Sequence, residues 1–199
     1  MRSVTELFRE RAVLFESVGK DAGFCNALSL FAKMITAALR RGNKIIIFGN
    51  GGSFAQSQHF AAELVGKYRT DRPALSAVSV PANMAAFSAY ANDVGFDRAI
   101  AREVEAYCVK GDVAIGLTTS DADLDTGHSA NLYHAFAAAR KKGATTLCLG
   151  SEKTEKLRKT ADGGIFVPNS DTPLVQEVHQ TVIHILCELI ESALTKKKK

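Results

Sequence analysis

Residues 45–66 read IIIFGNGGSFAQSQHFAAELVG and decide the fold class of the chain. The β-branched run Ile45–Ile47 stops abruptly at the polar, glycine-rich turn 49–53, and a helical pattern follows. A strand, a glycine turn and a helix in succession place backbone N–H groups and a helix N-terminus around an anion in many α/β proteins. The helix also carries His59 and Glu63. These two residues are four positions apart, so they lie on one face of the helix. The stretch therefore predicts a phosphate site that runs directly into a metal-binding or acid–base pair.

Each half of this signal is weak by itself. Glycine turns also simply connect strands to helices, and a His–Glu pair at this spacing is more often a surface hydrogen bond than a pair of ligands. The small apolar residues between His59 and Glu63 indicate a partly buried helix, which favours a functional pair. Ser53 and Ser129, near the starts of two predicted helices, are expected to cap them.

The alternation of strand and helix continues along the chain. We predict strands at 44–48, 75–80, 113–118, 144–149 and 164–167, and helices at 4–18, 21–41, 54–67, 83–90, 97–107, 129–142, 152–160 and 173–195. Five apolar strands separated by helices are typical of an α/β protein with a parallel, doubly wound sheet. Ligands bind at the carboxyl ends of the strands in such sheets, so the turns at 49–53 and 118–129 are expected at one edge. We expect a single domain over residues 1–199, with a helical N-terminal extension over about 1–41.

The composition excludes several classes of protein. A hydrophobic content of 46% and a charged content of 23% are typical of a globular chain. Lys and Arg number 25 against 21 Asp and Glu, but Lys196–Lys199 account for the excess, so we expect no nucleic-acid partner. The absence of a signal peptide and of an apolar run near 18 residues predicts a cytoplasmic protein without a membrane contact. The cysteines lie far apart in apolar patterns and are expected to be buried thiols: Cys25, Cys108, Cys148 and Cys187.

The last helical pattern carries further candidate side chains. The sequence Asp-Thr-Pro at 171–173 is a typical helix start, and Gln176, Glu177, His179 and His184 follow it. Gln176 and His184 are eight residues apart, about 12 Å along a straight helix, which is a long reach for one metal ion. Both side chains would have to lean toward each other, or two chains would have to contribute. Taken alone, His184 in its apolar surroundings is more typical of a core histidine, and His179 is a reserve ligand.

The segments GNGGS, QHFAAEL, NDVGFD and TPLVQEVHQTVIHILCELIE together resemble those of the phosphoheptose isomerases, which are sugar-isomerase (SIS) proteins. The resemblance covers nearly the whole chain from about Ala38. It implies a three-layer, flavodoxin-like sheet and conversion of sedoheptulose 7-phosphate to D-glycero-D-manno-heptose 7-phosphate, in ADP- or GDP-heptose biosynthesis for lipopolysaccharide or other glycans. It also implies one Zn²⁺ per subunit and a homotetramer with its sites between subunits.

The resemblance further implies roles for individual residues. The zinc ligands would be His59, Glu63, Gln176 and His184, with Glu63 and His184 as the catalytic residues. The substrate would be bound by Asn50, Gly51, Gly52, Ser53, Glu63, Asn92, Asp93, Thr118, Thr119, Ser120, Ser129 and Gln176. An aldose–ketose isomerisation needs a base beside the carbonyl and an acid that returns the proton to the neighbouring carbon. Glu63 is expected to make the first transfer and His184 to assist the second, but a metal-bound histidine is not a free base, so the division of roles stays open.

The chain departs from this family in the loop after the third strand. The family pattern STSGNSxN is matched at its start by 118–120 and at its end by 129–131, with DADLDTGH between them. Its carboxylates, Asp121, Asp123 and Asp125, would repel a phosphate unless they turn outward or hold a cation. The spacing does not complete a calcium loop, so a solvated extension is favoured. This loop leaves two alternatives open, an isomerase for another sugar phosphate and a non-catalytic SIS binding or regulatory protein.

Overall fold

The computed structural model describes residues 2–195, and the Lys196–Lys199 tail lies outside this range. It contains one parallel five-stranded sheet in the order β2-β1-β3-β4-β5. The strands are β1 (Ile45–Gly49), β2 (Ala77–Val80), β3 (Val113–Leu117), β4 (Thr145–Ser151) and β5 (Gly163–Val167). This is the flavodoxin-like strand order. The predicted doubly wound sheet is therefore confirmed.

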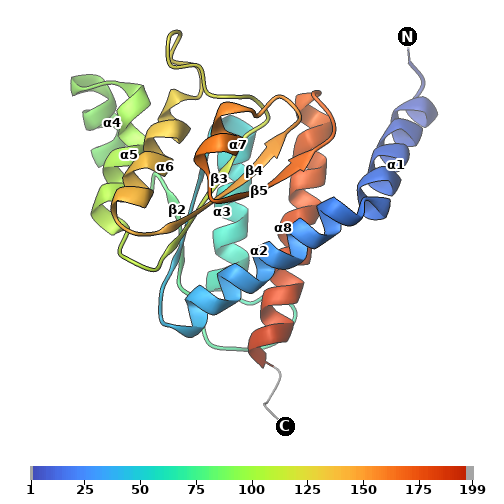
Figure 1. Ribbon diagram of the computed structural model, residues 1–199, viewed down its shortest axis with the longest axis horizontal. Coiled ribbons are helices and arrows are strands. Elements are labelled where there is room, and N and C mark those ends of the chain that lie inside the picture. The colour runs from blue at the N-terminus through green and yellow to red at the C-terminus, as the bar shows by residue number, and fades with distance from the viewer. Residues whose placement is uncertain (1, 196–199) are drawn as a thin grey trace.

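The described part of the chain contains eight helices. They are α1 (Val4–Lys20), α2 (Ala22–Arg40), α3 (Gly51–Val65), α4 (Met84–Asp93), α5 (Phe96–Tyr107), α6 (Ala130–Lys141), α7 (Lys156–Thr160) and α8 (Thr172–Thr195). Figure 1 shows α2 and α8 on one side of the sheet and α4, α5 and α6 on the other. The core contacts assign α1 and α3 to the first layer and α7 to the second. The protein is thus built in three layers.

The central strand β1 explains why both faces of the sheet need helices. All five of its residues are buried, and it pairs with β2 on one side and β3 on the other. Ile45 and Ile47 belong to the core under α2, α3 and α8, whereas Ile46 and Phe48 belong to the core under α5 and α6. A strand that is apolar on both faces needs a cover on both, as in other parallel sheets.

Several predicted helix boundaries were wrong, and α4 ends at Asp93, three residues later than expected. Helix α3 begins at Gly51, three residues earlier than expected, with Asn50 as its N-cap, so Ser53 lies inside the first turn and is not the cap. Gly51 adopts a φ of +53°, which lets the chain leave β1 and enter the helix without an intervening loop. The predicted helix 152–160 is helical only from Lys156, because a turn held by the Thr154 N–H to the Ser151 carbonyl oxygen comes first.

Helix α2 is long and apolar enough to cross a membrane, judged by length and composition alone. Its apolar stripe, however, is part of the core. Leu28, Phe31 and Ile35 are buried in the layer that α2 forms with α8. We therefore interpret α2 as a core helix, the usual explanation for such a stripe in a folded protein.

The cysteines follow the prediction in three positions of four. Cys108, Cys148 and Cys187 are buried, and burial raises the pKa of Cys108 to about 11 and the pKa of each of the other two to about 12. Cys25 is exposed on α2, so its predicted burial was wrong. The helical period places Cys25 beside the apolar stripe rather than on it.

A buried ion pair ties the connection after α3 to helix α8. Arg72 Nε lies 3.1 Å from Glu191 Oε2, and the two side chains are only 4% and 5% exposed. Arg72 also donates to the carbonyl oxygens of Leu64 and Glu63, both at 2.9 Å. Burial raises the pKa of Glu191, but hydrogen bonds from the backbone N–H groups of Arg69 and other residues of this loop outweigh burial and leave the pKa below its usual value. The pair therefore fixes the C-terminal end of α3 against α8.

His179 is a core residue and not a ligand. It is fully buried, and its Nε2 lies 3.0 Å from the carbonyl oxygen of Gly150, to which it donates. Its Nδ1 has no hydrogen-bond partner among the described residues. A second proton would therefore be buried without an acceptor, and burial lowers the pKa of His179 to about 4. The reserve role considered for His179 in metal binding is thus not supported by its position.

We predict that Arg72→Met lowers the free energy of unfolding by about 3 kcal/mol, because removing one partner of a buried ion pair leaves the other buried charge uncompensated. Arg69→Met is the matched control. Arg69 also pairs with a glutamate of α8, at 3.2 Å, but the two side chains are 65% and 53% exposed. The control should change stability by less than about 0.5 kcal/mol. Urea denaturation at one protein concentration measures both, and equal losses would contradict a structural role of the Arg72 pair.

We predict that His179 makes the protein sensitive to acid. Its pKa in the folded protein, about 4, lies below the usual 6.5, so the unfolded chain binds a proton first as the pH falls. The stability contributed by neutral His179 is present above pH 6.5 and is lost as the pH falls toward 4. Between pH 7 and pH 5 wild type should lose about 2 kcal/mol more than His179→Gln. Urea denaturation at the two pH values measures this, and an unchanged difference between the two proteins would refute it.

Candidate functional site

A pocket of about 460 Å³ lies at the carboxyl ends of β1 and β3. The turn after β1, the loop after β3 and the start of α8 line it together. The lining residues are Asn50, Gly51, Gly52, Ser53, Phe96, Leu117, Thr118, Thr119, Ser120, Gly127, His128, Ser129, Thr172 and Gln176. The structure thus brings the two predicted phosphate loops, far apart in sequence, to one cavity.

Two amide side chains hold these loops together. Asn50 Nδ2 donates to Asn131 Oδ1 at 3.0 Å, and Asn131 Nδ2 donates back to Asn50 Oδ1 at 2.7 Å. Asn50 is the N-cap residue of α3, and Asn131 lies buried in the first turn of α6. The reciprocal pair fixes the N-terminal ends of two helices at the same edge, which is where an anion is best stabilised.

The glycine turn brings α3 close to α8. A Cβ atom on Gly52 would lie 2.7 Å from Gln176 Nε2, so a larger residue there would displace the Gln176 side chain. Gly51, Gly52 and Ser53 form the first turn of α3 and line the pocket. The Ser53 N–H donates to the Asn50 carbonyl oxygen at 3.0 Å. The donors that this turn offers to an anion are therefore the N–H groups of Gly51 and Gly52, which begin the helix.

The second loop supplies hydroxyl groups. Ser120 Oγ lies 3.2 Å from Ser129 Oγ, and Thr119 Oγ1 lies 3.1 Å from Thr172 Oγ1 at the start of α8. Thr118 Oγ1 donates to the Ser120 carbonyl oxygen at 2.8 Å and so shapes the turn. Ser129 is the N-cap residue of α6 with a φ of +53°, but its side chain makes no capping bond, because its hydroxyl points to Ser120 instead. The predicted capping by Ser129 was therefore wrong, although its place beside the pocket agrees with its predicted role.

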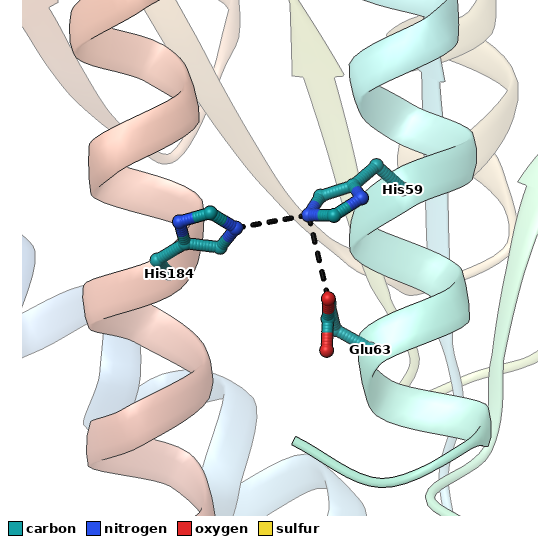
Figure 2. Close-up of side chains that lie close together, drawn as sticks. All are labelled: His59, Glu63 and His184. Atoms are coloured by element: carbon teal, nitrogen blue, oxygen red, sulfur yellow. Dashed lines mark hydrogen bonds and ion pairs between the residues drawn. The ribbon is translucent and has the colours of Figure 1, made fainter. Parts of the chain in front are cut away.

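Three further side chains converge between α3 and α8, as Figure 2 shows. His59 Nε2 lies 2.9 Å from His184 Nε2 and 3.5 Å from Glu63 Oε1. One possible ligand atom from each of the three residues lies within 4.8 Å of the other two. All three side chains are half-buried, so a substrate and solvent can reach them. His59 and Glu63 share one face of α3, as their spacing predicted, and the packing of α8 brings in His184.

This cluster fits a zinc ion by its donor set and spacing. Two imidazole nitrogens and a carboxylate oxygen are typical protein ligands of zinc. Zinc–nitrogen bonds of about 2.0–2.1 Å in a tetrahedral site place neighbouring ligand atoms about 3.3–3.4 Å apart. The separations of 2.9 and 3.5 Å observed here are close to that value. Zinc itself is not part of the structure, and the three residues could hold it after small rotations of their side chains.

Gln176, the fourth predicted ligand, is not part of this cluster. Its carboxamide lies beside Gly52 in the pocket, two helical turns before His184. The glutamine that contacts His184 is Gln180, with its Nε2 3.2 Å from His184 Nε2. Gln56 of α3 reaches the backbone of α8 by donating to the Gln176 carbonyl oxygen at 2.7 Å. The helical rise of about 1.5 Å per residue explains why Gln176 and His184 lie apart within one chain.

Two predicted substrate contacts lie elsewhere in this chain. Asn92 and Asp93 are exposed at the end of α4, where Asn92 Nδ2 donates to Asp93 Oδ1 at 3.0 Å, and neither lines the pocket. Conversely, Phe96, Thr172 and His128 line the pocket without having been predicted to do so. Phe96 could have been suspected, because it is an aromatic residue in the segment NDVGFD and is exposed. His128 could not, because its position at the pocket depends on the fold of the inserted loop.

Comparisons with known proteins agree with this arrangement. The family model described as "SIS domain" matches residues 24–151. The phosphoheptose isomerase of Pelobacter propionicus is 39% identical over 191 residues, covering 96% of this chain and 97% of that protein. The enzyme of the same name from Geobacter metallireducens is 40% identical and covers 97% of both chains. The solved structure of the phosphoheptose isomerase from Neisseria gonorrhoeae superposes with a TM-score of 0.84 at 31% identity, over 95% of this chain and 97% of that one. The chain therefore belongs to the phosphoheptose isomerase family of SIS-domain proteins.

Proposed function

We propose that this protein isomerises sedoheptulose 7-phosphate to D-glycero-D-manno-heptose 7-phosphate. One observation carries the proposal: a hydroxyl- and amide-lined pocket and an acid–base cluster lie along the same pair of helices, α3 and α8. Gln176 in the pocket and His184 in the cluster are eight residues apart, about 12 Å of helix. An extended seven-carbon chain with a terminal phosphate is of comparable length. The phosphate at carbon 7 can therefore occupy the pocket while carbons 1 and 2 lie beside the cluster.

The pocket residues would hold the phosphate by neutral hydrogen bonds and helix N-termini. The groups proposed for this role are the backbone of Asn50, Gly51 and Gly52 and the hydroxyls of Ser53, Thr119, Ser120 and Ser129. Thr118 would shape the loop, since its hydroxyl donates to the Ser120 carbonyl oxygen. Gln176 lines the pocket on the α8 side, and we propose that it donates to a substrate hydroxyl. Binding at one end fixes the reacting carbons at the other, which lowers the entropy cost of reaching the transition state.

Glu63 and His184 would carry the proton transfers. Glu63 removes a proton from carbon 1 of the ketose, and oxygen 2 receives a proton, which gives the 1,2-enediol. Oxygen 1 then loses its proton and carbon 2 gains one, which gives the aldose. Glu63 is half-buried, and His184 has Gln180 against its Nε2, so both side chains are held in place for these steps. We propose Glu63 for the carbon-bound proton. We propose His184 for the oxygen-bound proton only while its Nε2 holds no metal, because a metal-bound histidine is not a free base.

We propose that His59, Glu63 and His184 also hold one zinc ion per subunit. When bound, zinc supplies positive charge that polarises the substrate oxygens on carbons 1 and 2. Gln176, the other ligand expected from the family resemblance, would have to reach the same ion from two turns away, so we assign it to the substrate instead.

Three broader features are also proposals. We propose a homotetramer with sites at subunit interfaces, which fits the exposed position of Asn92 and Asp93 outside their own chain's pocket. We propose that the helices before Arg41 belong to one domain with the rest, since Arg11 of α1 pairs with Glu177 of α8 at 2.9 Å. We propose that the protein is cytoplasmic and serves bacterial heptose biosynthesis, including that for lipopolysaccharide.

We predict that metal-replete wild type converts sedoheptulose 7-phosphate and that Glu63→Gln lowers kcat at least about a hundredfold, because the amide cannot accept the proton. NMR of the sugar phosphates measures the turnover. Glu188→Gln, an exposed glutamate of α8, is the control and should keep the wild-type rate. Unchanged turnover in Glu63→Gln would refute the catalytic role. No turnover by wild type with zinc bound would direct the search to another sugar phosphate.

We predict that the purified protein holds about one zinc per chain and that a chelator abolishes turnover, which added Zn²⁺ restores. His59→Ala and His184→Ala should each lower the zinc content, since two ligands are seldom sufficient for tight binding. His134→Ala is the control, because His134 lies on α6 near Asp97 and away from the cluster. Elemental analysis of the purified proteins measures this. Full zinc content in both ligand variants would show that the cluster is not the metal site.

A further inference from the structure

The inserted loop between β3 and α6 keeps its acidic side chains out of the pocket. Asp121 accepts hydrogen bonds from the backbone N–H groups of Lys156 and Leu157 at 2.7 and 3.1 Å, and so stabilises the start of α7. Asp123 accepts from the backbone of the loop itself, at residues 125 and 126. None of the loop's three aspartates lines the pocket. The sequence predicted that these carboxylates would repel a phosphate. Because they point away from the pocket, this repulsion is avoided. In Figure 1 this loop projects beyond the helices, between β3 and α6.

The same loop contributes one exposed histidine to the wall of the pocket. His128 lines the pocket, and its Nε2 lies 3.1 Å from Ser120 Oγ, which in turn lies 3.2 Å from Ser129 Oγ. The backbone N–H of Asp123 donates to the His128 carbonyl oxygen at 2.8 Å, which closes the loop and holds the backbone of His128 in place. Imidazole and two hydroxyls thus form a row along one wall of the pocket.

His128 is also the one residue of this lining that can carry a positive charge. Among the described residues that form the pocket there is no lysine or arginine, and no aspartate or glutamate. A phosphate dianion would otherwise meet only neutral donors and helix N-termini. An imidazole N–H is a good donor to a phosphate oxygen in either charge state, because the neutral ring still carries one N–H.

We propose that His128 binds the phosphate group of the substrate through its Nε2–H, as a recognition residue supplied by the inserted loop. The proposal rests on the proposed function in taking a sugar phosphate as the ligand. Ser120 and Ser129 have rotatable hydroxyls and would donate to the same phosphate once His128 turns its N–H toward it. The loop between β3 and α6 then serves phosphate binding, since it places an imidazole at the wall of the pocket.

The test compares phosphate binding with turnover in variants of His128. His128→Ala should weaken the binding of inorganic phosphate, followed by ³¹P NMR, at least about tenfold, the usual effect of losing a hydrogen bond to a charged group. It should raise KM for sedoheptulose 7-phosphate by a similar factor while kcat stays within about threefold, since the phosphate lies away from the reacting carbons. His128→Gln should recover most of the affinity, because its Nε2 can take the position of the imidazole nitrogen.

The controls and the opposite outcomes separate this proposal from the function itself. Asp125→Asn changes the same loop outside the pocket and should leave phosphate affinity within about twofold of wild type. His128→Ala with wild-type phosphate affinity would overturn the proposal, whatever the turnover. Phosphate binding that depends on His128, in a protein that turns over no heptose phosphate, would support the proposal and refute the proposed function.

Discussion

The position of β1 at the centre of a parallel sheet is the constraint on which the site depends. β1 is buried on both faces and paired on both sides, so the turn that follows it must lie at the carboxyl edge of the sheet. The parallel neighbour β3 ends at the same edge, so its loop meets that turn. The Asn50–Asn131 pair then locks the two helix N-termini together. A binding pocket follows from the sheet topology before any catalytic residue is considered.

The packing of α8 along α3 brings His59, Glu63 and His184 together. Gln56 and Gly52 contact α8 at the level of Gln176, and His59 meets His184 further along. Contact over several turns gives the two helices a fixed register, and the buried Arg72–Glu191 pair secures the far end. Functional groups on packed helices are held more firmly than groups on loops, which suits proton transfers between close atoms.

The side chains of the pocket and those of the cluster are positioned by different kinds of structural element. The cluster lies on two long helices, whereas part of the pocket wall is a loop whose shape depends on its own hydrogen bonds. Asp121 and Asp123 serve as acceptors for backbone N–H groups, so negative charge that would oppose phosphate binding stabilises the loop instead. A change in this wall can thus leave α3 and α8, which carry the cluster, undisturbed.

The strand–helix alternation, the glycine turn and the pairing of His59 with Glu63 can be predicted from the amino-acid sequence, because they depend on local periodicity and on residues a few positions apart. The sequence also indicated the family through motifs spread over the chain. Three further features could be found only in the folded protein: His179 is a core residue, Gln180 rather than Gln176 contacts His184, and His128 lines the pocket while the aspartates do not. Those outcomes depend on which residues of distant segments pack together, and on how a loop satisfies its own backbone, neither of which leaves a periodic signal in the sequence.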